Sequence, residues 1–248
     1  MINLVRIFSY LSLIILFNRC DNSIIYDNEI SDQIDKEIKD DLDNKNFVLS
    51  NDESYSFLAL GDSYTVGEGV PFEESWPNQF VDYALERGLD IKNPKIIAET
   101  GWKTYDLLNA IKSSSLSVKY DYISLLIGVN NQFNSRPLNE FEDDLNKILA
   151  EINYLKKGNS KIIVISIPDW GYSPYGSNFD RERISDEIDQ FNIILEIFSE
   201  ENNLNFVDVT QISRLAINQP NLIAKDNLHP SGLMYLEWVK KIYENWIN

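Results

Sequence analysis

The sequence predicts an α/β protein, a three-layer α/β/α sandwich with a five-stranded parallel sheet in the middle. Two observations support this fold class. Short apolar runs alternate with longer amphipathic segments from residue 56 onward, and this alternation is typical of parallel strands joined by right-handed crossover helices. The apolar runs are also mostly continuous, which is the pattern of strands that helices cover on both faces.

Each of the five expected strands is followed by a helix. The strands are expected at 56–60, 95–99, 121–128, 161–167 and 205–209. The helices are expected near 75–87, near 104–114, from Pro137 to about Leu155, at roughly 182–200 and after Pro230. The spacing of apolar residues predicts that the last helix buries one stripe, formed by Leu233, Leu236, Val239, Ile242 and Trp246.

Residues 1–20 have the pattern of an export signal. A mostly apolar run of 11 residues ends at Phe17, and the only cysteine, Cys20, follows shortly after it. Such a run suits a signal peptide and is too short to span a bilayer. The segment resembles a bacterial lipoprotein signal, in which the cysteine becomes the lipidated first residue, although Asn18 and Arg19 stand where small residues are usual. The alternative is an ordinary secretory signal with an incidental cysteine.

Residues 21–55 are predicted to be an acidic, disordered tether. They hold 11 acidic and 3 basic residues and few apolar side chains to bury. Residues 56–248 are then expected to fold as one domain. We expect the protein to be exported and held at the cell envelope by a lipid on Cys20, or secreted if that cysteine is unmodified.

The charge and residue counts exclude several classes of function. The chain has 22 basic and 39 acidic residues, a formal net charge of −17. Nucleic acid is therefore a poor partner, because phosphate backbones are bound by Lys and Arg. One cysteine excludes an intrachain disulfide. One cysteine and one histidine argue against a structural zinc site, which uses four such ligands.

Candidate catalytic residues follow the first strand and precede the last helix, where open α/β sheets bind ligands. Ser63 follows Gly61 and Asp62, and a helix starting there would favour negative charge on its hydroxyl. Asp226 stands three residues before His229, the only histidine, and can orient its ring so that the second nitrogen acts as a base. Taken singly, a capped turn and an incidental histidine are the more common interpretations.

Two further residues follow the second and third strands. Gly101 can present an unobstructed backbone N–H, and Asn130 a side-chain amide. With the backbone N–H of Ser63 they would place three donors around one point, as an oxyanion requires. Each alone is more typical of a turn, but all of these residues follow strands or precede the last helix on the same face of the sheet. That arrangement favours a catalytic set.

In combination these segments resemble the SGNH hydrolases, also called the GDSL esterase/lipase family. The resemblance covers residues 56–248 through FLALGDSYTVGEG, ETGWKTYDLL, LLIGVNNQF and DNLHPSGLMY. It implies that Ser63 is the nucleophile and that His229, oriented by Asp226, is the general base. It also implies that Gly101, Asn130 and the Ser63 N–H stabilise the oxyanion.

One position departs from the family pattern. The third segment usually reads Gly-x-Asn-Asp, and here the last residue is Asn131. We expect activity to survive, because the amide that stabilises the oxyanion belongs to Asn130. Any hydrogen bond that the usual aspartate accepts is expected to change. No Gly-x-Ser-x-Gly segment occurs in the chain, which argues against an α/β-hydrolase.

Aromatic residues are concentrated near the predicted site. They either line an acyl pocket, stack on a sugar ring or simply pack the loops. A cleft lined in this way favours a neutral ester over a phosphorylated one. The residues are Trp102, Phe133, Trp170, Tyr172 and Tyr175.

The leading interpretation is a serine esterase that forms an acyl-enzyme and needs no metal or organic cofactor, and we expect the protein to be a monomer. Its substrate is left open among a lysophospholipid, a short-chain acyl ester, a thioester and an acetylated glycan. One alternative is a flavodoxin-like cofactor-binding module, whose phosphate loop would contain Ser63, Thr65, Gly67 and Gly69. Another is an envelope-anchored binding protein that has lost activity.

Overall fold

A five-stranded parallel sheet forms the centre of the fold in the computed structural model, which describes residues 54–114, 116 and 118–247. The strands are β1 (Phe57–Gly61), β2 (Lys95–Ala98), β3 (Tyr120–Leu126), β4 (Lys156–Ile165) and β5 (Asn205–Val207). They lie in the order β2-β1-β3-β4-β5, and every neighbouring pair is parallel. The predicted fold class is therefore confirmed. Reversal of strand order at β1 and β3 creates the crevice in which such sheets bind ligands.

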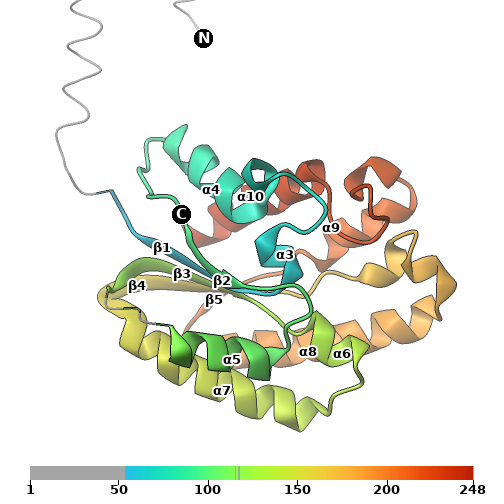
Figure 1. Cartoon of the computed structure of the whole chain (residues 1–248), viewed down its shortest axis with the longest axis horizontal. Coiled ribbons are helices and arrows are strands. Elements are labelled where there is room, and N and C mark those ends of the chain that lie inside the picture. Colours follow the sequence, from blue (N-terminus) through green and yellow to red (C-terminus); the bar gives the residue numbers. More distant parts are fainter. Residues whose placement is uncertain (1–53, 115, 117, 248) are drawn as a thin grey trace, which may run out of the picture. The chain divides into compact units, whose positions relative to one another are not determined.

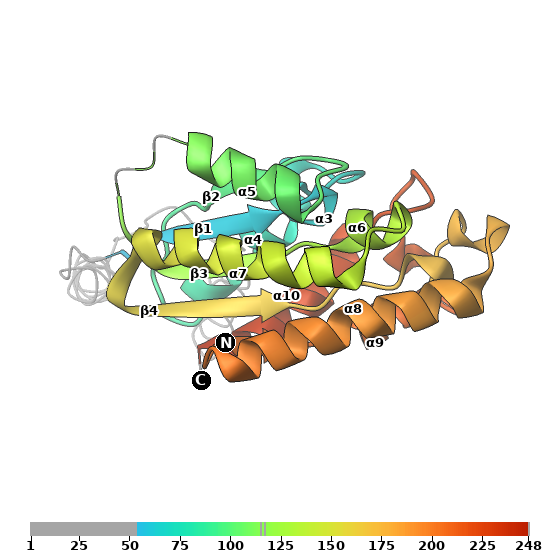
Figure 2. The same cartoon turned by 90° about the horizontal axis from the view of Figure 1, so that it is seen from below.

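Helices cover both faces of the sheet (Figure 1). The helices α4 (Trp76–Leu85) and α10 (Gly232–Trp246) lie on one face, whereas α5 (Thr104–Ser113), α7 (Leu138–Leu155) and α8 (Arg181–Glu201) lie side by side on the other (Figure 2). The short helices α3 (Ser63–Val66), α6 (Val129–Phe133) and α9 (Thr210–Arg214) follow β1, β3 and β5. Single 3₁₀ turns span Phe72–Glu74, Trp170–Tyr172, Gly176–Asn178, Leu215–Ile217 and Pro220–Leu222.

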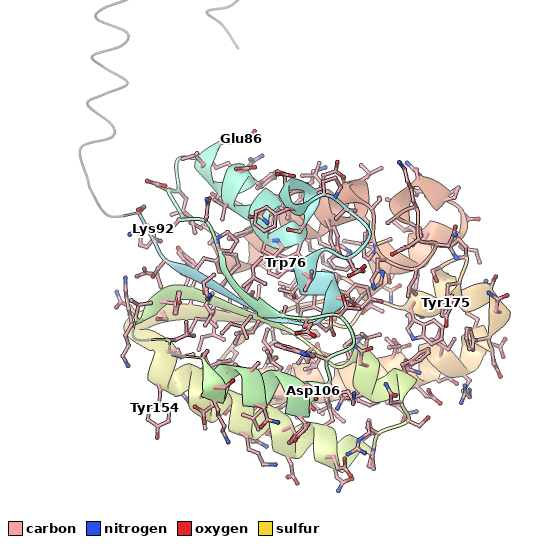
Figure 3. All side chains as sticks on the ribbon, viewed as in Figure 1. Trp76, Glu86, Lys92, Asp106, Tyr154 and Tyr175 are labelled. Atoms are coloured by element: carbon pink, nitrogen blue, oxygen red, sulfur yellow. The ribbon has the colours of Figure 1, made fainter. Side chains whose placement is uncertain are left out.

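Aromatic rings fill the space between the sheet, α4 and α10. The ring of Phe57 on β1 lies 5.6 Å from those of both Phe80 and Trp246, centroid to centroid. Figure 3 shows Trp76 directed inward beneath α4. Each such ring buries roughly 150–250 Å², so this layer anchors β1 and, with it, the turn that follows its carboxyl end.

The last helix buries only part of the predicted stripe. Leu233 is 44% exposed and Leu236 is partly exposed, whereas Met234, Tyr235 and Trp238 are buried. Val239, Ile242 and Trp246 are buried as expected. The helix turns its largest rings toward the core, because burying an aromatic ring removes more apolar area from water than burying a leucine at the helix start.

Strand β4 begins earlier than its apolar run. Its first residue, Lys156, pairs with Tyr120, and the register then shifts before Tyr122 pairs with Lys161. The residues 156–161 are polar and largely exposed, so they carry no hydrophobic signal for a strand.

The predicted signal segment 1–20, its Cys20, and the tether up to residue 53 lie outside the described residues. Tyr55, at the end of the predicted tether, already contacts the domain: its N–H donates to the carbonyl of Asp90 at 2.9 Å, and its ring meets Tyr122 edge-on. None of the helices that the structure describes combines the length and the apolar character needed to cross a membrane.

Candidate active site

Ser63 is the first residue of α3, directly beyond the carboxyl end of β1. Asp62 caps this helix: its Oδ1 accepts the N–H of Tyr64 at 3.1 Å, and the helix ends at Gly67 in the left-handed conformation. The serine is 5% exposed. Its backbone N–H stands at a helix start, where no turn precedes it to accept the hydrogen bond. The backbone of Ser63 is thus held at the carboxyl end of β1, at the start of a capped helix.

The loop before α10 brings His229 and Asp226 to the same point. The imidazole Nε2 lies 3.1 Å from the Ser63 Oγ, and Nδ1 lies 2.7 Å from the Asp226 Oδ2. The three residues predicted for nucleophilic catalysis therefore form one continuous hydrogen-bonded line. With the proton of Nδ1 directed to the carboxylate, Nε2 is free to accept the serine hydrogen.

The Asp226 carboxylate is held from several sides. Its Oδ1 accepts the N–H groups of Leu228 at 2.9 Å and of His229 at 3.0 Å. Partial burial opposes ionisation, but these two N–H groups and the imidazole outweigh it and hold the pKa of Asp226 below its ordinary value. The group beside His229 is therefore charged at neutral pH, as an orienting carboxylate has to be.

Gly69 allows the Asp226 carboxylate to approach the loop that follows α3. Its φ is +84°, and a Cβ added there would lie 2.7 Å from the Asp226 Oδ2. Next to it, the Glu68 carboxylate accepts the hydroxyl of Thr100 at 2.7 Å. This hydrogen bond connects the loop that follows α3 to the turn that contains Gly101.

The two other predicted donors lie on neighbouring loops. Gly101 is exposed, has a φ of +87°, and has no atom within 4 Å of the place where a Cβ would stand. Asn130 lies in the first turn of α6 and donates one Nδ2 hydrogen to the carbonyl of Trp102 at 3.0 Å. That bond fixes the amide and leaves its second hydrogen available.

Asn131, which replaces the usual aspartate, is 3% exposed. Its Oδ1 accepts the N–H of Thr104 at 3.0 Å, and its Nδ2 donates to the Thr104 Oγ1 at 2.8 Å. The amide therefore both accepts and donates at the start of α5.

The structure brings three of the five predicted aromatic residues together. The Trp170 ring is 6% exposed and touches Phe133 and Tyr175, with centroids 5.4 Å and 6.1 Å away. Phe179, which the sequence did not single out, completes this aromatic cluster and is 42% exposed. Trp102 is half-buried, and Tyr172 has the Arg181 guanidinium 5.2 Å from its ring centroid.

The aromatic cluster adjoins the catalytic loops. Phe133 stands three residues after Asn130, and the N–H of Tyr175 donates to the carbonyl of Asn227 at 2.9 Å. Figure 3 shows Tyr175 at the end of the domain toward which the strands point, with Tyr154 at the opposite end. Phe133 and Tyr175 remain 49% and 39% exposed, so the cluster offers an apolar surface beside the site.

Two residues of the segment around Ser63, Asp62 and Tyr64, have roles at the site that the sequence pattern does not predict. Asp62 is fully buried, and this burial, only partly offset by N–H groups including those of Tyr64 and Gly128, raises its pKa to about 7. The Tyr64 ring meets the imidazole of His229 edge-on at 5.7 Å. Both residues look like ordinary turn residues in the sequence.

Comparisons with known proteins bear on the family and the fold of the chain. A family model described as "GDSL-like Lipase/Acylhydrolase family" matches residues 59–236. No curated protein matches the chain by sequence.

Several solved structures share the fold. A lipolytic protein of the G-D-S-L family from Veillonella parvula is 18% identical, with a TM-score of 0.60 over 76% of this chain and 96% of its own. An acetylxylan esterase from Geobacillus stearothermophilus is 20% identical, with a TM-score of 0.60 over 78% and 94%. A psychrotrophic esterase from Pseudoalteromonas is 18% identical, with a TM-score of 0.59 over 77% and 96%.

Proposed function

The chain belongs to the GDSL-like lipase/acylhydrolase family and is a carboxylic ester hydrolase, and from this premise we propose that it works as a serine esterase with Ser63 as the nucleophile. The observation that carries the proposal is the line from Asp226 through His229 to Ser63, with separations of 2.7 Å and 3.1 Å. This membership also argues against the flavodoxin-like alternative. Thr65 of the supposed phosphate loop is fully buried.

In the first half of the reaction Ser63 Oγ attacks the ester carbonyl carbon while its proton passes to His229 Nε2. The carbonyl electron pair moves onto oxygen, and the oxyanion is stabilised by the Ser63 N–H, the Gly101 N–H and the free amide hydrogen of Asn130. When the tetrahedral intermediate collapses, the bond to the alkoxy oxygen breaks and His229 gives that oxygen its proton. An acyl-serine and a free alcohol result.

Water completes the cycle. His229 Nε2 takes a proton from water as the oxygen attacks the acyl carbon, and the same three donors stabilise the second oxyanion. Collapse breaks the bond to Ser63 Oγ, which recovers the proton from His229, and a carboxylic acid leaves. Asp226 stays ionised throughout and stabilises the imidazolium form of His229.

We propose a neutral acetyl ester of a glycan as the substrate class to test first. The exposed rings of Phe133, Tyr175 and Phe179 offer an apolar surface for the flat face of a sugar. The domain from residue 56 carries a formal charge of −11, since residues 1–19 contribute +2 and residues 21–55 contribute −8, and this charge disfavours anionic substrates. One of the similar structures is an acetylxylan esterase.

The proposed activity is tested by assaying the protein on p-nitrophenyl acetate, p-nitrophenyl octanoate, acetylated xylo-oligosaccharide and lysophosphatidylcholine. We expect both acetyl esters to be hydrolysed, the glycan with the higher kcat/KM, and Ser63→Ala to hydrolyse none of the four. Preference for octanoate or the lysophospholipid would contradict the glycan proposal and leave the serine mechanism standing. Hydrolysis by Ser63→Ala would contradict the mechanism itself.

We further propose that the protein is exported and anchored to the cell envelope through a lipid on Cys20, with residues 21–55 as the tether. The support is the sequence pattern of residues 1–20, and stable anchoring requires the several acyl chains of a bacterial lipoprotein. Mass spectrometry of the mature N-terminus tests this. An unmodified Cys20, or cleavage at another position, would leave a secreted esterase.

A further inference from the structure

Asn131, Thr104 and Asp144 form a chain of hydrogen bonds next to the segments that contain the proposed oxyanion donors, and each hydroxyl or amide in it donates to the next residue. Asn131 Nδ2 donates to Thr104 Oγ1 at 2.8 Å, and Thr104 Oγ1 donates in turn to Asp144 Oδ2 at 3.0 Å. Thr104 is fully buried and Asn131 is 3% exposed. The chain links α6, α5 and α7, because each element supplies one of its three members.

This chain holds the two loops that carry Gly101 and Asn130. Gly101 stands three residues before Thr104, and Asn131 Oδ1 also accepts the N–H of Thr104 at 3.0 Å. Asn130 in turn donates to the carbonyl of Trp102 at 3.0 Å. A displacement of Thr104 relative to Asn131 would therefore change how the two donors are placed relative to each other around Ser63.

We propose that Asn131 is a positioning residue of the oxyanion hole, and that position 131 has to carry an amide because Asp144 already takes the hydroxyl hydrogen of Thr104. The inference rests on the proposed function and adds a requirement specific to this chain. A threonine hydroxyl has one hydrogen to donate. With a carboxylate at position 131, two carboxylates would compete for that hydrogen, and no group would donate to Thr104 Oγ1.

The surrounding charges would not compensate a new carboxylate. Asn131 and Asp144 line a cavity of about 280 Å³ together with Lys103, which directly precedes α5, and with charged residues from α5, α7 and the loop between α6 and α7. Each cation nearby already pairs with an acid: Lys103 with Asp106 at 3.3 Å, Arg136 with Glu140, and Lys147 with Asp144 at 3.1 Å. An added negative charge would therefore lack a free partner among the described neighbours.

The test compares Asn131→Asp, Asp144→Asn and the double variant in the full chain, with p-nitrophenyl acetate as substrate. Asn131→Asp is expected to lower kcat about 30-fold with KM within about twofold, because misplaced donors fail mainly in the transition state. In the double variant the amide at position 144 can donate to Thr104 Oγ1, and Thr104 can donate to the carboxylate at position 131. The direction of the chain is then reversed, and kcat is expected to return to within about threefold of the wild type.

Asp144→Asn alone is the matched control. Its amide oxygen can still accept from Thr104, so kcat is expected to stay within about threefold of the wild type. Unchanged kcat in Asn131→Asp would overturn the positioning role. A loss of kcat that Asp144→Asn does not restore would overturn the argument that the amide is required by Asp144.

Thermal unfolding of the same proteins separates this inference from the proposed function. Asn131→Asp is expected to lower Tm by about 5 °C, because it leaves the buried hydroxyl of Thr104 without its hydrogen-bond donor, and the added Asp144→Asn is expected to recover most of that shift. This coupling does not depend on catalysis. If the wild type hydrolyses no ester, the proposed function and the positioning role both fail, while the Tm values still decide whether the chain requires an amide.

Discussion

Two aspartates lie near Ser63: Asp62 directly before it at the start of α3, and Asp226 on the loop before α10. Their surroundings shift their pKa values in opposite directions. Asp62 is fully buried, and this burial raises its pKa to about 7. The Asp226 side chain is 33% exposed, and N–H groups of Leu228 and His229, with the imidazole, overcome its partial burial and lower its pKa. The same side chain is thus neutral in mild acid in one place and charged in the other.

The two aspartates have different roles because they stand in different places in the site. A neutral carboxyl at the start of α3 can still accept the N–H of Tyr64 and cap the helix, and it adds no negative charge next to the serine that has to lose a proton. The charged carboxylate lies beyond His229, where it stabilises the imidazolium form. When Asp62 is neutral, only the charge of Asp226 acts on the proton transfer, and it favours movement of the proton from Ser63 toward His229.

The largest expected effect comes from removing the charge of Asp226. Asp226→Asn should lower kcat about 10⁴-fold with little change in KM, because an amide cannot hold the required tautomer of His229 or stabilise its protonated form. Steady-state kinetics on p-nitrophenyl acetate measures this, and a thermal unfolding curve shows whether the fold persists. A folded variant with near-wild-type kcat would mean that another group orients His229.

A smaller effect is expected from displacing the same carboxylate without changing it. Gly69→Ala places a Cβ against the Asp226 Oδ2, and kcat should fall about 10²-fold because the line to Ser63 is misplaced. Gly88→Ala is the matched control: its φ is +82°, nothing lies within 4 Å of the added Cβ, and kcat should not change. Equal kinetics for the two variants would show that Asp226 tolerates the displacement.

The smallest effect on activity is expected from Asp62→Asn. Its main expected effect is on how the free energy of unfolding depends on pH. The folded pKa of Asp62, about 7, lies above its ordinary value of 3.8, so its contribution is full below about pH 4 and is lost as the pH rises to about 7. Asp62→Asn cannot titrate. The difference in unfolding free energy between the wild type and this variant should therefore change by up to roughly 4 kcal/mol across that window.

For Asp226→Asn, the difference in unfolding free energy from the wild type is expected to depend on pH in the opposite direction. The lowered pKa of Asp226 means that its contribution to stability is present above its ordinary pKa and is lost as the pH falls below it. Urea unfolding at a series of pH values gives both curves. A pH-independent difference for Asp62→Asn would contradict the raised pKa on which the comparison depends.

Much of the fold follows from hydrophobic pattern, because a strand such as β1 is buried along its whole length and its five residues are correspondingly apolar or small. The hydrophobic pattern is less informative where strand pairing or competition between side chains for the core, rather than burial alone, determines the structure. The start of β4 at Lys156 depends on pairing with Tyr120. The exposure of Leu233 depends on the larger rings that α10 turns toward the core.

The site divides in the same way. Ser63, Asp226 and His229 could be singled out because their residue types and order carry the chemistry. Gly69 could not be assigned to the carboxylate of Asp226, since that contact joins loops far apart in the chain. The fit of Asn131 depends on Thr104 and Asp144, and sequence order alone gives no sign of this cluster.

The central claim is that Ser63 is the nucleophile, and reaction with a serine-directed organophosphonate followed by peptide mass spectrometry tests it most directly. We expect one adduct, on Ser63, formed at the rate at which hydrolysis of p-nitrophenyl acetate is lost, and no adduct in Ser63→Ala. An adduct on another serine that abolishes activity, or full activity in a protein labelled at Ser63, would contradict it.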